Sequence, residues 1–207
     1  MSTQNQSEIE KKISASFRES VDAKQATLKT EKQKIIQAAD LMFKAISSGN
    51  KIMSCGNGGS AADSQHFIAE LVNRFEVERD PIAAISLTTD TSILTAVSND
   101  YSYNEIFSKQ VQALGQPGDI LVAISTSGNS ENILAAVRVA KKKRIKTILL
   151  TGITNGIINE SLASDDLIIN VQTNITARIQ ETHILIIHCL CQALDFQILH
   201  AKEEQYA

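Results

Sequence analysis

An alternation of short apolar segments with segments of helical character, beginning at Lys51, constrains the fold most strongly. The expected strands are rich in isoleucine, valine and leucine and cover residues 51–56, 81–87, 119–125, 145–152 and 166–172. The expected helices between and after them cover residues 60–75, 92–98, 103–114, 130–143 and 177–204. Strands this apolar are buried on both faces, as in a parallel sheet covered by helices. The pattern therefore predicts an α/β fold, a three-layer sandwich around a five-stranded parallel sheet.

Two further helices, over residues 7–28 and 30–50, are predicted ahead of this pattern. The first carries Ile9, Ile13, Phe17 and Val21 at a regular four-residue step, which gives it one apolar stripe. A helix outside the α/β pattern must bury such a stripe elsewhere, and a neighbouring subunit would provide the surface. With two prolines and no low-complexity linker, residues 1–207 are expected to form a single domain. Residues 1–49 are its N-terminal helical segment, used in oligomerisation.

The overall composition is that of a soluble globular protein, with 43% hydrophobic and 21% charged residues. A net charge of -3 favours neither nucleic acid nor an anionic membrane as a partner. The basic cluster at residues 141–144 suits the end of a helix, and a partner surface is the alternative. The chain shows no secretory signal, and the longest apolar run, residues 183–194, is expected to be too short for a membrane span. Its three cysteines lie in apolar segments, which favours reduced thiols and a cytoplasmic location.

Two loops are expected at the carboxyl ends of strands, where ligands of such sheets bind. The segment "GNGGSA", residues 56–61, matches a dinucleotide-binding pattern only weakly, because the nearest suitable acid, Asp90, lies too far along the chain. A tight strand-to-helix turn is the alternative. The segment "STSGNS", residues 125–130, offers four hydroxyls before a helix, which predicts a site for a phosphate monoester. An elaborate helix N-cap is the alternative there.

A histidine and a carboxylate, His66 and Glu70, lie one turn apart on the helix that follows the first loop. This spacing can hold a metal or set an acid beside a base, and an ordinary surface pair is the alternative. The C-terminal helix adds Gln180, Glu181, His183 and His188 within an apolar segment, where polar side chains need partners. Two such clusters beside a phosphate loop indicate a site.

The motifs "SCGNGGS", "QHFIAEL", "SND", "AISTSGNS", "LTG" and "ARIQETHILIIH", taken in order, resemble those of the bacterial phosphoheptose isomerases. These are sugar-isomerase (SIS) domain proteins with a flavodoxin-like or Rossmann-like fold that act on sedoheptulose 7-phosphate. The resemblance covers almost the whole chain and implies a homotetramer with active sites between subunits. It also implies one zinc ion per subunit. The matching metal ligands are His66, Glu70, Gln180 and His188.

The resemblance further implies an aldose–ketose isomerisation through an enediol, giving D-glycero-D-manno-heptose 7-phosphate for lipopolysaccharide precursors. Glu70 is the expected base and His188 the expected acid, although zinc binding would lower the basicity of Glu70. We expect His183 not to be a ligand. In the loop after "LTG", the segment "ITNGII" departs from the glycine-richer run of the family. The substrate-binding positions that match are Asn57, Gly58, Gly59, Glu70, Asn99, Asp100, Ser125, Thr126, Ser127, Ser130 and Gln180.

A second reading is a non-catalytic SIS-domain tetramer that binds the replication initiator DnaA. The segments "NRFEVERDPIAAISL" and "HCLCQALD" look similar to that branch. Because Glu70 and His188 are both present, the sequence favours the enzyme, and DnaA binding stays open as an additional role. Nucleotide-sugar binding through residues 56–61 is the least favoured reading, because the loop lacks its acid.

Overall fold

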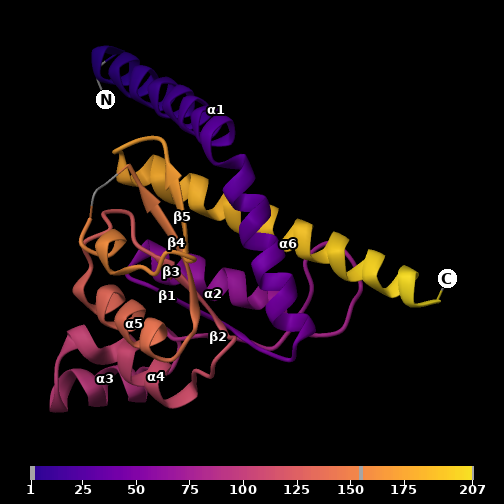
Figure 1. The fold of residues 1–207 in the computed structure, drawn as a ribbon. Helices are drawn as coiled ribbons and strands as arrows, with labels where there is room; N and C mark the ends of the chain where they lie inside the picture. The colour runs from indigo at the N-terminus through magenta and orange to yellow at the C-terminus, as the bar shows by residue number, and fades with distance from the viewer. Residues whose placement is uncertain (1–2, 154–155, 207) are drawn as a thin grey trace.

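The computed structural model describes residues 3–153 and 156–206, so residues 154 and 155 of the "ITNGII" loop lie outside the described chain. Within it, five strands form one parallel sheet in the order β2-β1-β3-β4-β5 (Figure 1). The strands are β1 (Ile52–Gly56), β2 (Ala84–Ser86), β3 (Ile120–Ile124), β4 (Lys146–Gly152) and β5 (Leu167–Val171). The predicted five-stranded parallel sheet is confirmed.

The helices lie on both faces of this sheet, as the α/β pattern predicts. They are α1 (Thr3–Ser47), α2 (Gly59–Val72), α3 (Thr91–Asp100), α4 (Ile106–Leu114), α5 (Glu131–Lys142) and α6 (Thr176–Tyr206), with short 3-10 turns η1 (Tyr103–Glu105) and η2 (Asn159–Ser161). One core joins α1, α2 and α6 to one face of the sheet, and a second joins α3, α4 and α5 to the other. Successive strand residues alternate between the cores: Val122 lies in the first and Ala123 in the second.

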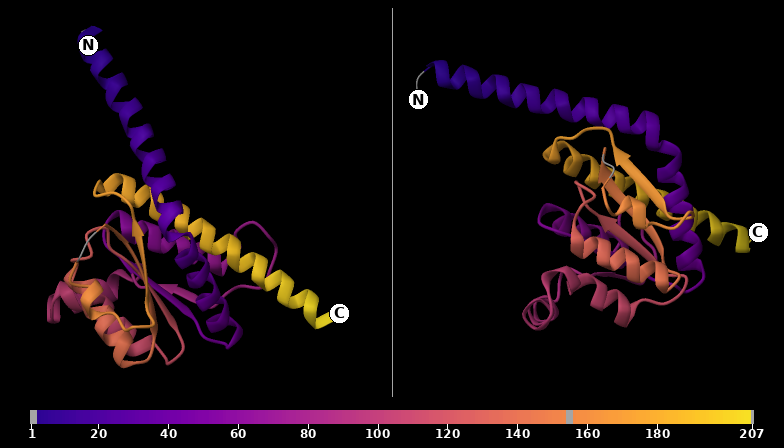
Figure 2. Two further views of the ribbon diagram at one scale, coloured as in Figure 1. Left: turned by 45° about the horizontal axis from the view of Figure 1, so that its top comes forward. Right: turned by 60° about the vertical axis from the view of Figure 1, so that its left-hand side comes forward.

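The N-terminal segment differs from the prediction of two helices, because residues 3–47 form one continuous helix, α1. No glycine or proline lies between the two predicted segments to end the hydrogen-bond ladder. The helix is nevertheless bent (Figures 1 and 2). The hydroxyl of Thr27 donates to the carbonyl of Ala23 at 2.7 Å, and that of Thr30 to Ala26 at 3.3 Å. Such bonds to the preceding turn often bend a helix.

Helix α1 also covers the free edge of the sheet at β5. The backbone N–H of Gln172 donates to the Thr27 hydroxyl at 3.0 Å, and that of Asn170 donates to the carboxylate of Glu31 at 3.3 Å. Thr27 and Glu31 are both buried. Two N–H groups that an edge strand would otherwise leave unpaired are therefore satisfied by side chains of the helix.

The apolar stripe predicted for the N-terminal segment is uncovered within one chain. Ile9, Ile13, Phe17 and Val21 are all exposed, and Phe17 is 73% exposed. The part of α1 that carries them extends beyond the sheet in all three views (Figures 1 and 2). The rest of the helix packs through Ala38 and Met42 into the first core.

Helix α6 passes along the first core, where Ile187, Leu190 and Leu194 are fully buried. Contrary to the expectation of too short a segment, its 26 residues Thr176–Ala201 are long and apolar enough to cross a membrane, judged by length and composition alone. A core helix passes the same test, and α6 packs against α1 and α2. Its place in the core explains only part of this apolar character, because 33% of the apolar window is buried and Leu185 and Phe196 are exposed.

All three cysteines are free thiols, as the sequence predicts. Cys55 lies in β1 with no exposed surface, and burial raises its pKa to about 12. Cys191 of α6 is buried as well, and its pKa is also raised to about 12, chiefly by burial. Since the thiolate is the reactive form of cysteine, both side chains act as core packing residues.

Candidate active site

The sheet places the two predicted loops side by side. The chain leaves β1 toward β2 on one side and then returns to β3 on the other, so the direction of winding reverses between β1 and β3. Ligands of open α/β sheets bind at the carboxyl end of such a switch point. The loop after β1 enters α2 through Gly58, which has a φ of 55°, a left-handed conformation that favours glycine. The loop after β3 leads into α5.

A reciprocal pair of side-chain amides joins these two loops. Asn57 Nδ2 donates to Asn132 Oδ1, and Asn132 Nδ2 donates to Asn57 Oδ1, both at 2.9 Å. The hydroxyl of Tyr103 donates to the same Asn57 oxygen at 3.1 Å. The side chain of Asn57 is thus largely occupied within the protein. Sequence reasoning identified Asn57 but missed Asn132 and Tyr103, which become neighbours only in the folded chain.

The serine-rich loop, residues 125–130, brings several hydroxyls to the N-terminus of α5. The hydroxyls of Ser125 and Ser130 lie 3.1 Å apart, and Gly128 between them has a φ of 67°. Ser130 is the N-cap of α5, but its side chain makes no capping hydrogen bond. The alternative of an elaborate N-cap is therefore weakened, because the hydroxyl that should serve as the cap faces Ser125 instead. Hydroxyls and free amides at a helix N-terminus suit a phosphate monoester.

The histidine and carboxylate positions converge from two helices. His66 Nε2 lies 3.0 Å from Glu70 Oε1 on α2, and 3.2 Å from Nε2 of His188 on α6. Two Nε2 atoms that both lack a proton repel each other at this distance. Either one of them carries a proton and donates it to the other, or both face a cation. The surface-pair alternative for His66 and Glu70 is thus replaced by a three-residue cluster. Phe75, which the sequence did not single out, stacks on His188 with ring centroids 5.4 Å apart.

The three converging side chains, His66, Glu70 and His188, are of kinds that bind zinc. Zinc binds histidine and carboxylate at about 2.0–2.2 Å, so two ligand atoms of a zinc tetrahedron lie roughly 3.3 Å apart. The two distances from His66 Nε2, 3.0 Å and 3.2 Å, are close to that value. No group of three or more histidine, cysteine, aspartate or glutamate side chains forms a preformed metal site among the described residues. A bound ion would therefore require these side chains to move from their positions in this structure.

Gln180 lies at the opposite end of α2 from Glu70. A Cβ atom added to Gly59 would lie 2.5 Å from Gln180 Nε2. Because Gly59 has no side chain, the amide of Gln180 can lie against the start of α2, beside the glycine loop. The described contacts place Gln180 next to predicted substrate positions and give it no contact with His66 or His188.

Asn99 and Asp100 end helix α3. Both are exposed, and Asn99 Nδ2 donates to Asp100 Oδ1 at 2.8 Å. Tyr103, three residues beyond Asp100, contacts Asn57 of the glycine loop. The segment that follows α3 thus reaches the candidate site, while Asn99 and Asp100 have no described contact with the other predicted residues.

Two polar residues of α6 lie away from the cluster. Glu181 accepts from Arg178 at 2.6 Å, and Arg178 donates to the carbonyl of Ser16 in α1. His183 has no exposed surface and lies beside the backbone of Thr151, with its pKa lowered to about 4 by burial. The structure thus places His183 in the core and gives it no contact with the predicted ligands.

A further acid, Asp63, lies one turn before His66 on α2. One of its carboxylate oxygens is buried without a hydrogen-bond partner. Burial raises the pKa of Asp63 to about 6, although the charge of His66 opposes that shift. Sequence reasoning missed this residue. Asp63 precedes His66 by three residues and Glu70 by seven, and this spacing, which places all three on one face of a helix, was the available signal.

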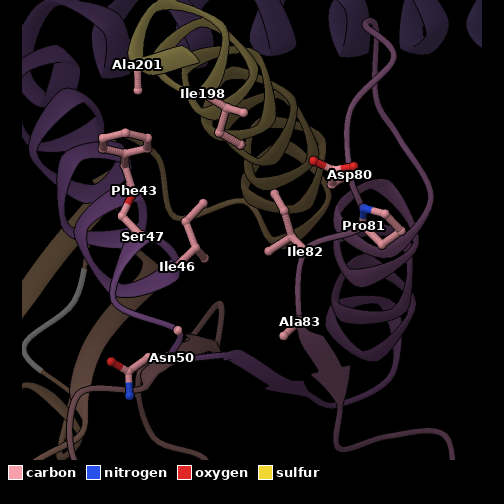
Figure 3. Close-up of a pocket in the computed structure, with 11 residues that line it drawn as sticks. Phe43, Ile46, Ser47, Asn50, Asp80, Pro81, Ile82, Ala83, Ile198 and Ala201 are labelled. Carbon is pink, nitrogen blue, oxygen red and sulfur yellow. The ribbon is translucent and has the colours of Figure 1, made fainter. Parts of the chain in front are cut away.

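A separate hollow of about 390 Å³ lies at the other end of the sheet, before β1 and β2. Figure 3 shows its mainly apolar lining, in which Phe43 and Ile46 of α1 and Ile198 of α6 surround Ile82. The hollow faces the amino ends of the strands. It is therefore distinct from the candidate active site.

The fold and these two loops define a SIS-domain protein, and the SIS domain family model matches residues 16–152. A phosphoheptose isomerase of Shewanella sp. (strain ANA-3) is 51% identical over 194 residues, which are 94% of this chain and 98% of the relative. The structure of a phosphoheptose isomerase from Neisseria gonorrhoeae matches with a TM-score of 0.86 at 48% identity, covering 90% of this chain and 98% of that one. One from Francisella tularensis matches with a TM-score of 0.87 at 43% identity, covering 94% and 99%.

The chain belongs to the phosphoheptose isomerase family of SIS-domain proteins. The family predicted from the sequence motifs is thus confirmed. The three relatives named here are all phosphoheptose isomerases. They lend no support to the DnaA-binding alternative.

Proposed function

We propose that this chain converts sedoheptulose 7-phosphate to D-glycero-D-manno-heptose 7-phosphate, an aldose–ketose isomerisation that supplies heptose for lipopolysaccharide precursors. One observation carries the proposal: His66, Glu70 and His188 converge from two helices in a chain of the phosphoheptose isomerase family. The serine loop beside the switch point adds a place for the phosphate. The same features support the predicted roles of the site residues.

The serine loop holds the phosphate end of the sugar in this proposal. Ser125, Thr126, Ser127 and Ser130 offer hydroxyls, and the N-terminus of α5 offers backbone N–H groups. Its donors are neutral, so binding depends on hydrogen bonds and helix dipoles. At the other end of the sugar, Gln180 and the glycine loop after β1 contact hydroxyls and orient C1 and C2.

The chemistry moves one proton between two carbons. Glu70 removes the proton from C1 of the ketose and returns it to C2, with an enediol between the two steps. His188 donates a proton to the oxygen on C2 as the carbonyl is lost. It then takes the proton from the oxygen on C1 as the aldehyde forms, which restores its starting state. His66, 3.0 Å from the Glu70 carboxylate, fixes the orientation of the base.

The ligands of one zinc ion per subunit would be His66, Glu70 and His188. Gln180 completes the predicted set, although in this structure its amide lies beside Gly59, at the other end of α2. When bound, zinc supplies a Lewis acid that polarises the carbonyl and hydroxyl oxygens. The proposal rests on the donor set and the spacing around His66. Glu70 is thereby assigned both to the metal and to the moving proton, and these roles oppose each other because coordination lowers the basicity of a carboxylate.

A homotetramer in the cytoplasm is part of the same proposal. The exposed stripe of Ile9, Ile13, Phe17 and Val21 on α1 supports it, because an uncovered apolar stripe of this kind marks an interaction surface. A Phe17→Glu variant should then lower the mass measured by light scattering. An unchanged mass would remove this stripe from the interface.

The deciding experiment is turnover of sedoheptulose 7-phosphate by the purified protein, before and after chelation and after zinc is restored. Activity that is lost with the chelator and returns with zinc would support both the reaction and the metal. Activity that resists chelation would support the reaction and contradict the metal. A protein that binds zinc but gives no product would contradict the enzyme, and binding to DnaA would then be measured.

A further inference from the structure

The segment that joins α2 to β2 contributes one partner of a buried ion pair. Residues 73–80 form neither helix nor strand, yet the side chain of Arg79 is only 1% exposed. Its Nε lies 2.7 Å from Oδ1 of Asp195 on α6, whose side chain is 4% exposed. A charged pair at this depth requires many compensating hydrogen bonds.

Arg79 satisfies this requirement at the end of α2. Its Nη2 donates to the carbonyl of Glu70 at 2.8 Å, and its Nη1 donates to the carbonyls of Leu71 at 2.9 Å and Asp80 at 3.2 Å. The carbonyls of Glu70 and Leu71 belong to the last turn of α2, where helix carbonyls lack intrahelical partners and the dipole favours a cation. The guanidinium thus fixes the backbone of the residue proposed as the base.

Asp195 makes the corresponding connection on α6. Its second oxygen accepts the backbone N–H of Glu76 at 3.3 Å. Asp195 follows His188 by seven residues, two helical turns, so both lie on the same side of α6. From the same connecting segment, Phe75 stacks on the His188 ring. One short segment therefore contacts the end of α2 and two positions of α6.

We propose that Arg79 and Asp195 are positioning residues of the active site. Their ion pair sets the separation of α2 and α6, and with it the geometry between His66 and Glu70 on one helix and His188 on the other. Stability alone is a weak explanation, because well-packed apolar side chains often replace a buried ion pair without loss of stability. An apolar pair would not bind the Glu70 carbonyl. The inference rests on the proposed isomerase function.

The test uses three variants. Two are the single substitutions Arg79→Lys and Asp195→Asn, and the third is an apolar double variant that combines Arg79→Met and Asp195→Leu. Outer partners of metal ligands typically contribute 10-fold to 100-fold, so we expect kcat to fall by about that factor. KM should change by less than about threefold, because the phosphate loop is untouched. Zinc affinity, measured by competition with a chromophoric chelator, should weaken by about tenfold or more.

Asp119→Asn is the matched control. Asp119 is also a buried carboxylate in an ion pair: its side chain is 2% exposed, and its Oδ2 accepts a hydrogen bond from Lys51 Nζ at 2.5 Å. It precedes β3, at the end of the sheet away from the site. Asp119→Asn should lower the melting temperature and leave kcat and zinc affinity unchanged, which separates a general loss of stability from a loss of positioning.

The outcomes are distinguishable. A wild-type protein that does not turn over sedoheptulose 7-phosphate contradicts the proposed function, and zinc affinity then tests the positioning alone. A folded double variant with wild-type kcat and zinc affinity overturns the positioning role. If Asp195→Asn does not fold, Arg79→Lys decides, because it keeps the positive charge and loses the planar fork. Wild-type behaviour of Arg79→Lys on both readouts would also overturn the inference.

Discussion

Asn57 and Asn132 exchange two amide hydrogen bonds of 2.9 Å across the switch point of the sheet. This pair fixes the loop after β1 to the start of α5. Because both amides are occupied by each other, their contribution to the site is structural. Contacts of Asn57 with a sugar would come mainly from its backbone. The serine-rich loop and the glycine loop are thus linked by side-chain hydrogen bonds.

Asn132→Ala should weaken the link between these two loops. Removing the buried Asn132 amide takes two hydrogen bonds from the Asn57 side chain. We expect a loss of about 1–3 kcal/mol in the free energy of unfolding. KM for the sugar phosphate should rise in parallel. Tyr103→Phe, which removes only the single bond to Asn57, should have a smaller effect on both quantities. Equal effects of the two variants, measured by urea unfolding and steady-state kinetics, would contradict the importance of the pair.

Glu70→Gln should abolish most turnover while leaving the assembly intact. The amide keeps the shape of the carboxylate and cannot accept the proton from carbon, so kcat should fall by about 10²–10⁴-fold. Glu78→Gln serves as the control, because that side chain is 91% exposed. Activity is measured with sedoheptulose 7-phosphate and assembly by light scattering. Near-normal activity of Glu70→Gln would remove Glu70 as the base.

Replacing both Ser125 and Ser127 with alanine should mainly weaken substrate binding. Each hydroxyl bonded to a phosphate is worth about 1.5–3 kcal/mol, so the loss of two should raise KM by about 100-fold or more with a smaller change in kcat. Ser48→Ala, at the end of α1, should leave KM unchanged. An unaltered KM in the double variant would assign the phosphate to another part of the chain.

His183 should make the protein sensitive to acid. Burial lowers its pKa to about 4 from the usual value of 6.5, so the unfolded chain binds a proton more readily than the folded one. Its contribution to stability is full above about pH 6.5 and is lost as the pH falls toward 4. The loss amounts to at most about 3 kcal/mol. In urea unfolding, His183→Gln should flatten the dependence on pH across this window, and His200→Gln, at an exposed position, should not.

Sequence reasoning located the strands well because each is an apolar run with clear limits. The predicted strand at 119–125 and the observed β3 at Ile120–Ile124 differ by one residue at each end. The prediction was less accurate for β2, which begins at Ala84 and not at residue 81. Residues 81–83 are apolar as well, and where a strand begins to pair depends on its neighbour β1.

The candidate site was predictable only in part. His66 and Glu70 were found by their helical spacing, and His188 by the resemblance to the family and its place in an apolar helix. The sequence carries no comparable signal for Arg79 and Asp195, which are 116 positions apart and meet only in the folded chain. The break predicted in α1 was wrong because its bend keeps the helix continuous. A bend without glycine or proline leaves little trace in composition.

The contact of α1 with β5 has a consequence for solubility. The sheet has two edges, of which β2 is only three residues long and β5 is covered through Thr27 and Glu31. Neither edge offers a long open strand to another copy of the chain, so association through helix faces is favoured over strand pairing. A chain shortened past Glu31 would lose this cover, and we expect the uncovered strand to make it prone to aggregate.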